Sequence, residues 1–82
     1  MSNTASNLQA QVRATIAEVL GVPVATLTGA SSPATIDAWD SVQHLSIVMA
    51  LEQSVGVQFD PEDIDKMKSV SEIEAIVAAK KS

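Results

Sequence analysis

Residues 40–55 read DSVQHLSIVMALEQSV, a stretch whose apolar residues recur at helical spacing on two separate faces. The wider face comprises Ile47, Val48, Leu51 and Val55. The narrower face, toward the opposite side, comprises Val42, Leu45 and Met49. A small helical domain can scarcely bury both, and a small apolar patch rimmed by polar groups is typical of a contact surface. We therefore expect the wider face to enter a core and the narrower face to meet partner proteins, although a tilted helix could also bury Leu45.

The start of this helix is marked by Asp40, a favoured N-cap residue, and by Ser41 directly after it. Gln43 stands where the reciprocal partner of a capping box is found, and Gly56 is a suitable end for the helix. Unpaired N–H groups and the helix dipole favour anions in the first turn, so a phosphate on the Ser41 hydroxyl would be well placed. Spacing alone also permits an ordinary first-turn serine, because Asp-Ser before a helix is common.

Three further helices are predicted, which gives an all-α fold, a small four-helix bundle. The first follows a flexible polar tail over residues 1–7, begins at Leu8 and ends at Gly21. Its apolar face comprises Leu8, Val12, Ile16, Val19 and Leu20. A long loop rich in Gly, Ser and Pro then leads to the second helix, and Leu27 and Ile36 can attach this loop to the core.

The chain after Gly56 predicts a short third helix and a longer last one. Asp60 can cap the third helix, with Pro61 at its first position and acidic residues in its first turn. Ser69 begins the last helix, and Glu72 completes a second capping box. The core face of the last helix comprises Ile73, Ile76 and Val77. Because no strand pattern occurs, we expect residues 8–80 to form one helical domain.

Composition excludes several classes of function. An 82-residue chain has room for one small core rather than for two domains around a cleft. With no cysteine and a single histidine, disulfides, thiolate catalysis and the common metal sites are excluded, so no metal is predicted. Ten acidic and five basic residues give a net charge of −5, which repels nucleic acid and anionic membrane surfaces and favours a monomer. The polar N-terminus lacks a secretory pattern and no apolar run could span a bilayer, so we expect a cytoplasmic protein.

Taken as a whole, residues 40–52 resemble the Asp-Ser-Leu segment and second helix of acyl carrier proteins. The similarity extends to the order of the elements: a helix, a long loop, the serine-headed helix, a short acidic helix and a final helix. By this resemblance Ser41 is the attachment residue for 4′-phosphopantetheine, which a separate phosphopantetheinyl transferase transfers from coenzyme A. The resemblance also implies that Asp40 belongs to the surface that the transferase recognises.

The same resemblance implies a carrier without catalytic residues of its own. Its thioester-bound acyl groups would pass between acyl-activating, acyl-transferring or condensing enzymes in fatty acid, lipid or specialised secondary biosynthesis. The implied partner-binding residues are Val42, Leu45, Met49, Glu52 and Phe59. Acyl carrier proteins also shelter acyl chains between their helices, and the lining that the resemblance implies is the aliphatic side of the second helix, with Phe59 and Met67 nearby.

Several residues differ from the usual pattern of carriers in fatty acid synthesis. Gln43, His44 and Ser46 stand where those carriers usually have carboxylates, and the acidic residues are shifted to the third helix. Trp39 is bulky where many of them have a small residue, and we expect it to anchor the loop to the bundle. These differences favour a specialised carrier that serves a dedicated pathway.

Three alternatives remain open. Asp40, Ser41 and His44 have the residue types of a hydrolase triad, but neighbours on one helical turn rarely reach the required geometry and no Gly-rich turn offers an oxyanion hole. We therefore expect His44 to pack beside the loop or to lie in solvent. A carrier of aminoacyl or peptidyl groups shares the fold and the serine. A helical interaction module without a prosthetic group is the third alternative.

Overall fold

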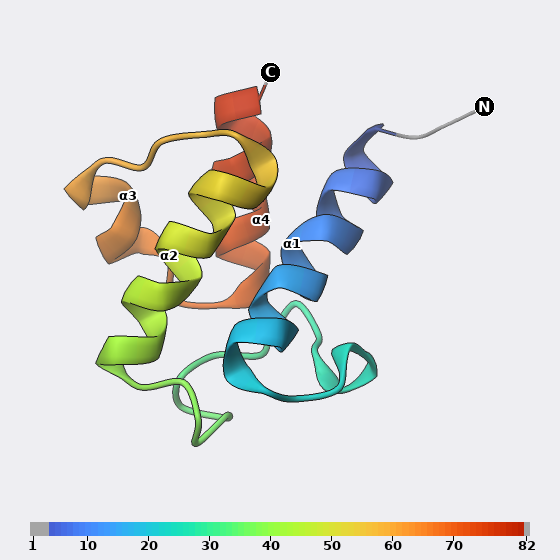
Figure 1. Ribbon diagram of the computed structural model, residues 1–82, viewed down its shortest axis with the longest axis vertical. Coiled ribbons are helices and arrows are strands. Elements are labelled where there is room, and N and C mark those ends of the chain that lie inside the picture. The colour runs from blue at the N-terminus through green and yellow to red at the C-terminus, as the bar shows by residue number, and fades with distance from the viewer. Residues whose placement is uncertain (1–3, 82) are drawn as a thin grey trace.

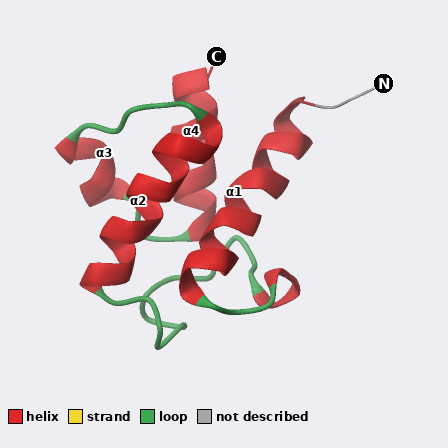
Figure 2. Ribbon diagram, viewed as in Figure 1, coloured by secondary structure: helices red, strands yellow, loops and turns green. Residues whose placement is uncertain are grey.

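The computed structural model describes residues 4–81 and consists of helices joined by loops (Figure 1). Helix α1 spans Thr4–Leu20, α2 spans Ser41–Val55, α3 spans Pro61–Lys66 and α4 spans Val70–Lys81. A single 3-10 turn, η1, lies at Val24–Thr26 in the loop after α1. Between residues 4 and 81 there is no strand, so the predicted all-α class is confirmed (Figure 2).

The core lies where α1 packs against both α2 and α4, while α3 packs against α4 and closes one side. All four residues of the wider face of α2 are buried, as predicted: Ile47, Val48, Leu51 and Val55. From α1 and α4 the core receives Val12, Ile16, Leu20, Ile73 and Val77. Leu8, Val19 and Ile76 are only half-buried but still pack against it. Burial of this aliphatic surface is the main favourable term for so small a fold.

Helix α1 begins earlier than the sequence pattern indicated. The sequence predicted a flexible tail over residues 1–7, but Thr4 to Asn7 are already helical. Residues 1–3 lie outside the described residues. The segment contains no Gly or Pro that would stop a helix. Each residue that is added to an existing helix gains one hydrogen bond, so a helix can continue into a polar segment.

The long loop between α1 and α2 is attached to the bundle at several points. Leu27 and Trp39 are almost fully buried, and Ile36 packs against the core as predicted. The carbonyls of Gly29 and Ser31 accept hydrogen bonds from the N–H groups of Ser71 and Val70, at 3.0 and 2.9 Å. These donors belong to the first turn of α4, where a helix has no partners of its own. The loop therefore caps α4 while it leads to the head of α2.

The helix ends confirm the predicted caps only in part. The Asp40 carboxylate accepts a hydrogen bond from the Gln43 N–H at 2.8 Å, but the reciprocal half of the predicted box is missing, because the Asp40 N–H donates to the Ala38 carbonyl. Ser69 is the residue before α4, and its hydroxyl accepts from the Glu72 N–H at 3.3 Å. Gly56 ends α2 with a φ of 72°, a left-handed conformation that favours glycine.

A polar contact that the sequence pattern did not predict joins α1 to α4. Arg13 Nε donates to the Glu74 carboxylate at 2.6 Å, and only 7% of the Glu74 side chain is exposed. A buried carboxylate needs such a partner, because an unpaired charge away from water is costly.

Within residues 4–81, no helix is both long and apolar enough to cross a membrane.

Candidate functional site

Ser41 is the first residue of α2 and is exposed to solvent. The Asp40 cap fixes the backbone immediately before it, so the serine has a defined place at the end of a regular helix. Among the described residues, the Ser41 hydroxyl makes no hydrogen bond that would hold it inside the protein. An exposed primary hydroxyl in this position can be reached by another enzyme.

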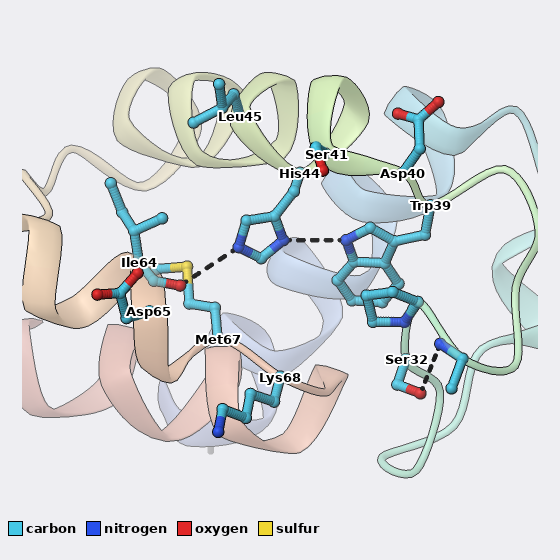
Figure 3. Close-up of a pocket in the computed structure, with 12 residues that line it drawn as sticks. Ser32, Trp39, Asp40, Ser41, His44, Leu45, Ile64, Asp65, Met67 and Lys68 are labelled. Atoms are coloured by element: carbon cyan, nitrogen blue, oxygen red, sulfur yellow. Dashed lines mark hydrogen bonds between the residues drawn. The ribbon is translucent and has the colours of Figure 1, made fainter.

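A groove of about 790 Å³ opens beside Ser41, between the end of the long loop, the first turns of α2, and α3 with the segment that follows it (Figure 3). More of its lining is apolar than polar. The residues that line it from the loop and α2 are Ser32, Pro33, Ala34, Trp39, Asp40, Ser41, His44 and Leu45. Across from them lie Ile64, Asp65, Met67 and Lys68. A flexible group attached to Ser41 would therefore have an apolar surface within reach.

The back of this groove is crossed by a chain of hydrogen bonds that we call the Trp39–His44–Ile64 bridge. Trp39 Nε1 donates to His44 Nδ1 at 3.0 Å, and His44 Nε2 lies 3.3 Å from the Ile64 carbonyl oxygen (Figure 3). Since Nδ1 accepts, the proton of a neutral ring is on Nε2 and points to Ile64. The bridge thus joins the end of the loop, α2 and α3. Trp39 anchors the loop and His44 packs beside it, as predicted, whereas the contact of His44 with the Ile64 carbonyl was not predicted.

The hydrolase alternative has no geometric support. Both ring nitrogens of His44 are engaged with Trp39 and Ile64, so neither is directed to the Ser41 hydroxyl. The Asp40 carboxylate is engaged by the Gln43 backbone rather than by the histidine. A base that activates a serine must be within hydrogen-bonding reach of its hydroxyl, and must be oriented by the acid.

The narrower apolar face of α2 is exposed. Val42, Leu45 and Met49 have 71%, 55% and 61% of their surface in contact with solvent. The possibility that helix tilt buries Leu45 is therefore wrong. We call these three residues the α2 patch. Large apolar side chains gathered on one helix face are candidates for contact with another protein.

Two further residues that the sequence predicted to bind partners, Phe59 and Glu52, make contacts within the fold. Phe59 is 9% exposed and belongs to the core, so it offers little surface to a partner. The Glu52 carboxylate accepts a hydrogen bond from the Phe59 N–H at 3.0 Å and so fixes the chain after α2. Met67 lines the groove beside Ser41, whereas Phe59 and the aliphatic side of α2 belong to the buried core. Helical periodicity could not reveal this, because Phe59 lies between helices.

The acidic side of the molecule is organised around α3. The Asp63 carboxylate lies 2.8 Å from Lys80 Nζ and accepts a hydrogen bond from the Asp60 N–H at 2.9 Å. The hydrogen bond to Lys80, and after it the Asp60 N–H, lower the pKa of Asp63 from its ordinary value. The same contact raises the pKa of Lys80. Glu62 and Asp65 are exposed on α3 and give this side its negative charge.

The residues at the head of α2 fit a covalently attached phosphate ester. Ser41 would supply the hydroxyl, and the first turn of α2, a helix of fifteen residues, presents the positive end of its dipole there. The groove beside Ser41 provides the apolar surface for a flexible arm. When bound, phosphopantetheine supplies the thiol that a chain without cysteine lacks.

Fold and site together define a small helical bundle with an exposed serine at the head of α2, beside a largely apolar groove. A family model described as "Phosphopantetheine attachment site" matches residues 10–77 of the chain. The solution structure of the holo acyl carrier protein from Geobacter metallireducens superposes with a TM-score of 0.80 at 26% sequence identity, covering 89% of this chain and 84% of that one. The chain therefore belongs to the phosphopantetheine-binding carrier family of acyl carrier proteins, which carry 4′-phosphopantetheine as a covalently attached group.

Proposed function

We propose that Ser41 bears the 4′-phosphopantetheine and that the chain delivers acyl groups to partner enzymes as thioesters on this arm. The observation that carries the proposal is the exposed Ser41 hydroxyl at the head of α2, beside the apolar groove. The hydroxyl oxygen forms a bond to the phosphorus of the phosphopantetheinyl group and gives up its proton, while the pyrophosphate P–O bond of coenzyme A breaks and adenosine 3′,5′-bisphosphate leaves. A separate phosphopantetheinyl transferase catalyses this step, so the carrier needs no catalytic base of its own.

The α2 patch is the proposed docking surface for the enzymes that load and unload the arm. It lies on the same helix as Ser41, so a partner that covers Val42, Leu45 and Met49 has the arm beside it. Methionine suits a surface that meets several partners, because its side chain adapts its shape at small cost. The acidic residues of α3 add electrostatic steering toward basic partner surfaces.

The proposed role is in a dedicated biosynthetic pathway rather than in primary fatty acid synthesis. Carboxylates are scarce on α2, where Glu52 is engaged by the backbone of Phe59. The surface of a partner enzyme that covers α2 is therefore expected to be mainly apolar. Trp39 and His44 occupy the back of the groove, where a smaller pair of residues would leave more room for cargo.

The modification can be tested by weighing the intact protein after incubation with coenzyme A and a promiscuous phosphopantetheinyl transferase. We expect the mass to increase by one phosphopantetheinyl group. Ser41→Ala should abolish the increase. Ser46→Ala is the matched control on the same helix and should retain the increase, because the Ser46 hydroxyl already donates to the Val42 carbonyl. An unchanged mass for the unaltered chain would contradict the proposal and favour an interaction module.

A further inference from the structure

The space between α2 and α3 is held closed at the back of the groove. Trp39 is 2% exposed, and its Nε1 donates to His44, which in turn reaches the Ile64 carbonyl of α3. This carbonyl also accepts the hydrogen bond of the Met67 N–H at 3.2 Å. The bridge therefore acts on the end of α3 and ties it to α2.

The side chains behind the bridge belong to one buried cluster with Trp39, from which solvent is excluded. Ile47 and Leu51 have no exposed surface and Met67 has 2%. For an acyl chain to pass between α2 and α3, His44 would have to leave Trp39 and Ile64. The indole N–H would then be buried without an acceptor, which is unfavourable in an apolar interior.

We propose that the Trp39–His44–Ile64 bridge determines the cargo of this carrier by confining it to the groove, so that short acyl groups are sheltered and longer chains stay in solvent. The inference rests on the proposed function, since the cargo is held through Ser41. Trp39 and His44 are the specificity-determining residues. Their role differs from that of the α2 patch, which faces the partner enzymes.

The proposal predicts how protection of the thioester depends on the length of the acyl chain. Each methylene that leaves water favours the sheltered state by about fourfold, the equivalent of ~0.8 kcal/mol. If the core admitted the chain, protection of the thioester would rise steadily with each added methylene. If the groove alone holds the chain, protection rises for short chains and then becomes constant.

The test loads the whole chain with butanoyl, octanoyl and dodecanoyl phosphopantetheine from the corresponding coenzyme A thioesters. Complete loading is first established from the intact mass. The rate of thioester cleavage by hydroxylamine is then divided by the rate for the same free coenzyme A thioester. We expect this protection to be equal for octanoyl and dodecanoyl groups. In the His44→Ala protein, dodecanoyl should be better protected than octanoyl, by up to about 250-fold if all four additional methylenes leave water.

Trp39→Phe is the second variant, because it keeps an aromatic ring but removes the N–H donor, and it should show the same change in a milder form. Gln53→Ala on the same helix is the matched control and should behave as the unaltered chain, since Gln53 is exposed and lies outside both the groove and the α2 patch. Steadily rising protection in the unaltered chain would overturn the inference, as would unchanged behaviour of folded His44→Ala and Trp39→Phe proteins. Failure to load the unaltered chain would instead overturn the proposed function, and the inference with it.

Discussion

Trp39 is the residue on which the site and the core depend together. Its ring is buried, while its single polar atom is satisfied by His44, at a distance of 3.0 Å. The two rings stack with their centroids 6.1 Å apart and an angle of 23° between the planes. A buried tryptophan contributes both a large apolar surface and one obligatory hydrogen bond. It therefore fixes the end of the long loop at the point where α2 begins.

At the scale of this residue we predict a large loss of stability in Trp39→Ala. Truncating a buried aromatic side chain costs about 3–5 kcal/mol, which combines the lost burial with the remaining cavity. The measurement is the free energy of unfolding from urea denaturation followed by circular dichroism. Val24→Ala is the control, because Val24 is half-exposed and its truncation should change stability by less than about 0.5 kcal/mol. Equal stability of the two variants would contradict this account of the core.

The sequence predicted the place of Ser41 but not the partners of His44. The serine follows a capping residue, and this local signal is sufficient to place it at the head of a helix. His44 contacts Ile64, twenty residues further along the chain, so its partner depends on where α3 packs. The exposure of Leu45 was left open for the same reason, since the tilt of a helix is decided by its neighbours.

At the scale of the element, the head of α2 depends on the Asp40 cap. We predict that Asp40→Ala destabilises the fold by about 1 kcal/mol, because the Gln43 N–H loses its acceptor. Asp40→Asn should keep most of this stability, since an amide oxygen can also cap. Urea denaturation measures the difference. A larger loss in Asp40→Asn than in Asp40→Ala would be inconsistent with a capping role.

The same two variants separate capping from recognition by the transferase. If the negative charge of Asp40 is recognised, Asp40→Asn should load phosphopantetheine more slowly in spite of its intact cap. The rate of the mass increase at limiting transferase measures this effect. Loading of Asp40→Asn at the rate of the unaltered chain would show that Asp40 acts as a cap alone.

We predict that substitutions in the α2 patch weaken the complex with partner enzymes. Leu45→Ser and Met49→Ser should leave stability within about 0.5 kcal/mol of the unaltered chain, because both side chains are largely exposed. Transfer of an acyl group to or from a cognate enzyme should nevertheless become slower, through a weaker complex. Val24→Ser, an exposed apolar position in η1, is the control for general surface effects. Unimpaired transfer in both patch variants would contradict docking at this surface.

At the scale of the whole molecule, the ion pair between Asp63 and Lys80 joins α3 to the end of α4. Because the pKa of Asp63 is lowered from its ordinary value of 3.8 by Lys80, the pair stabilises the fold above this pH. The stabilisation is lost as the pH falls through the lowered pKa of the folded state. We predict that Asp63→Asn is less stable than the unaltered chain at neutral pH and that the difference disappears in acid.

Urea denaturation at a series of pH values measures this difference. In a Lys80→Met background, Asp63→Asn should have a smaller effect, since the partner of the carboxylate is absent. High salt should also reduce the effect, because both side chains are near the surface. A difference between Asp63→Asn and the unaltered chain that persists at pH values well below 3.8 would contradict the assignment to this ion pair.

The order and class of the helices could be predicted because α1, α2 and α4 each have an apolar period, while the short α3 is marked by Asp60 and Pro61 at its start. The burial of Ile47 and Leu51 follows from that period alone. The start of α1 was predicted too late, because polar residues extend a helix without an apolar signal. The Arg13–Glu74 pair and the contact of the loop with α4 join segments far apart in the chain, and a periodic pattern contains no information on them.

The attachment of the arm to the Ser41 hydroxyl can be tested by fragmentation mass spectrometry of the loaded peptide that contains this residue. We expect every fragment that carries the phosphopantetheinyl mass to include Ser41, and fragments that start at Val42 to be unmodified. An arm found instead on Ser31, Ser32 or Ser46 would contradict attachment at Ser41.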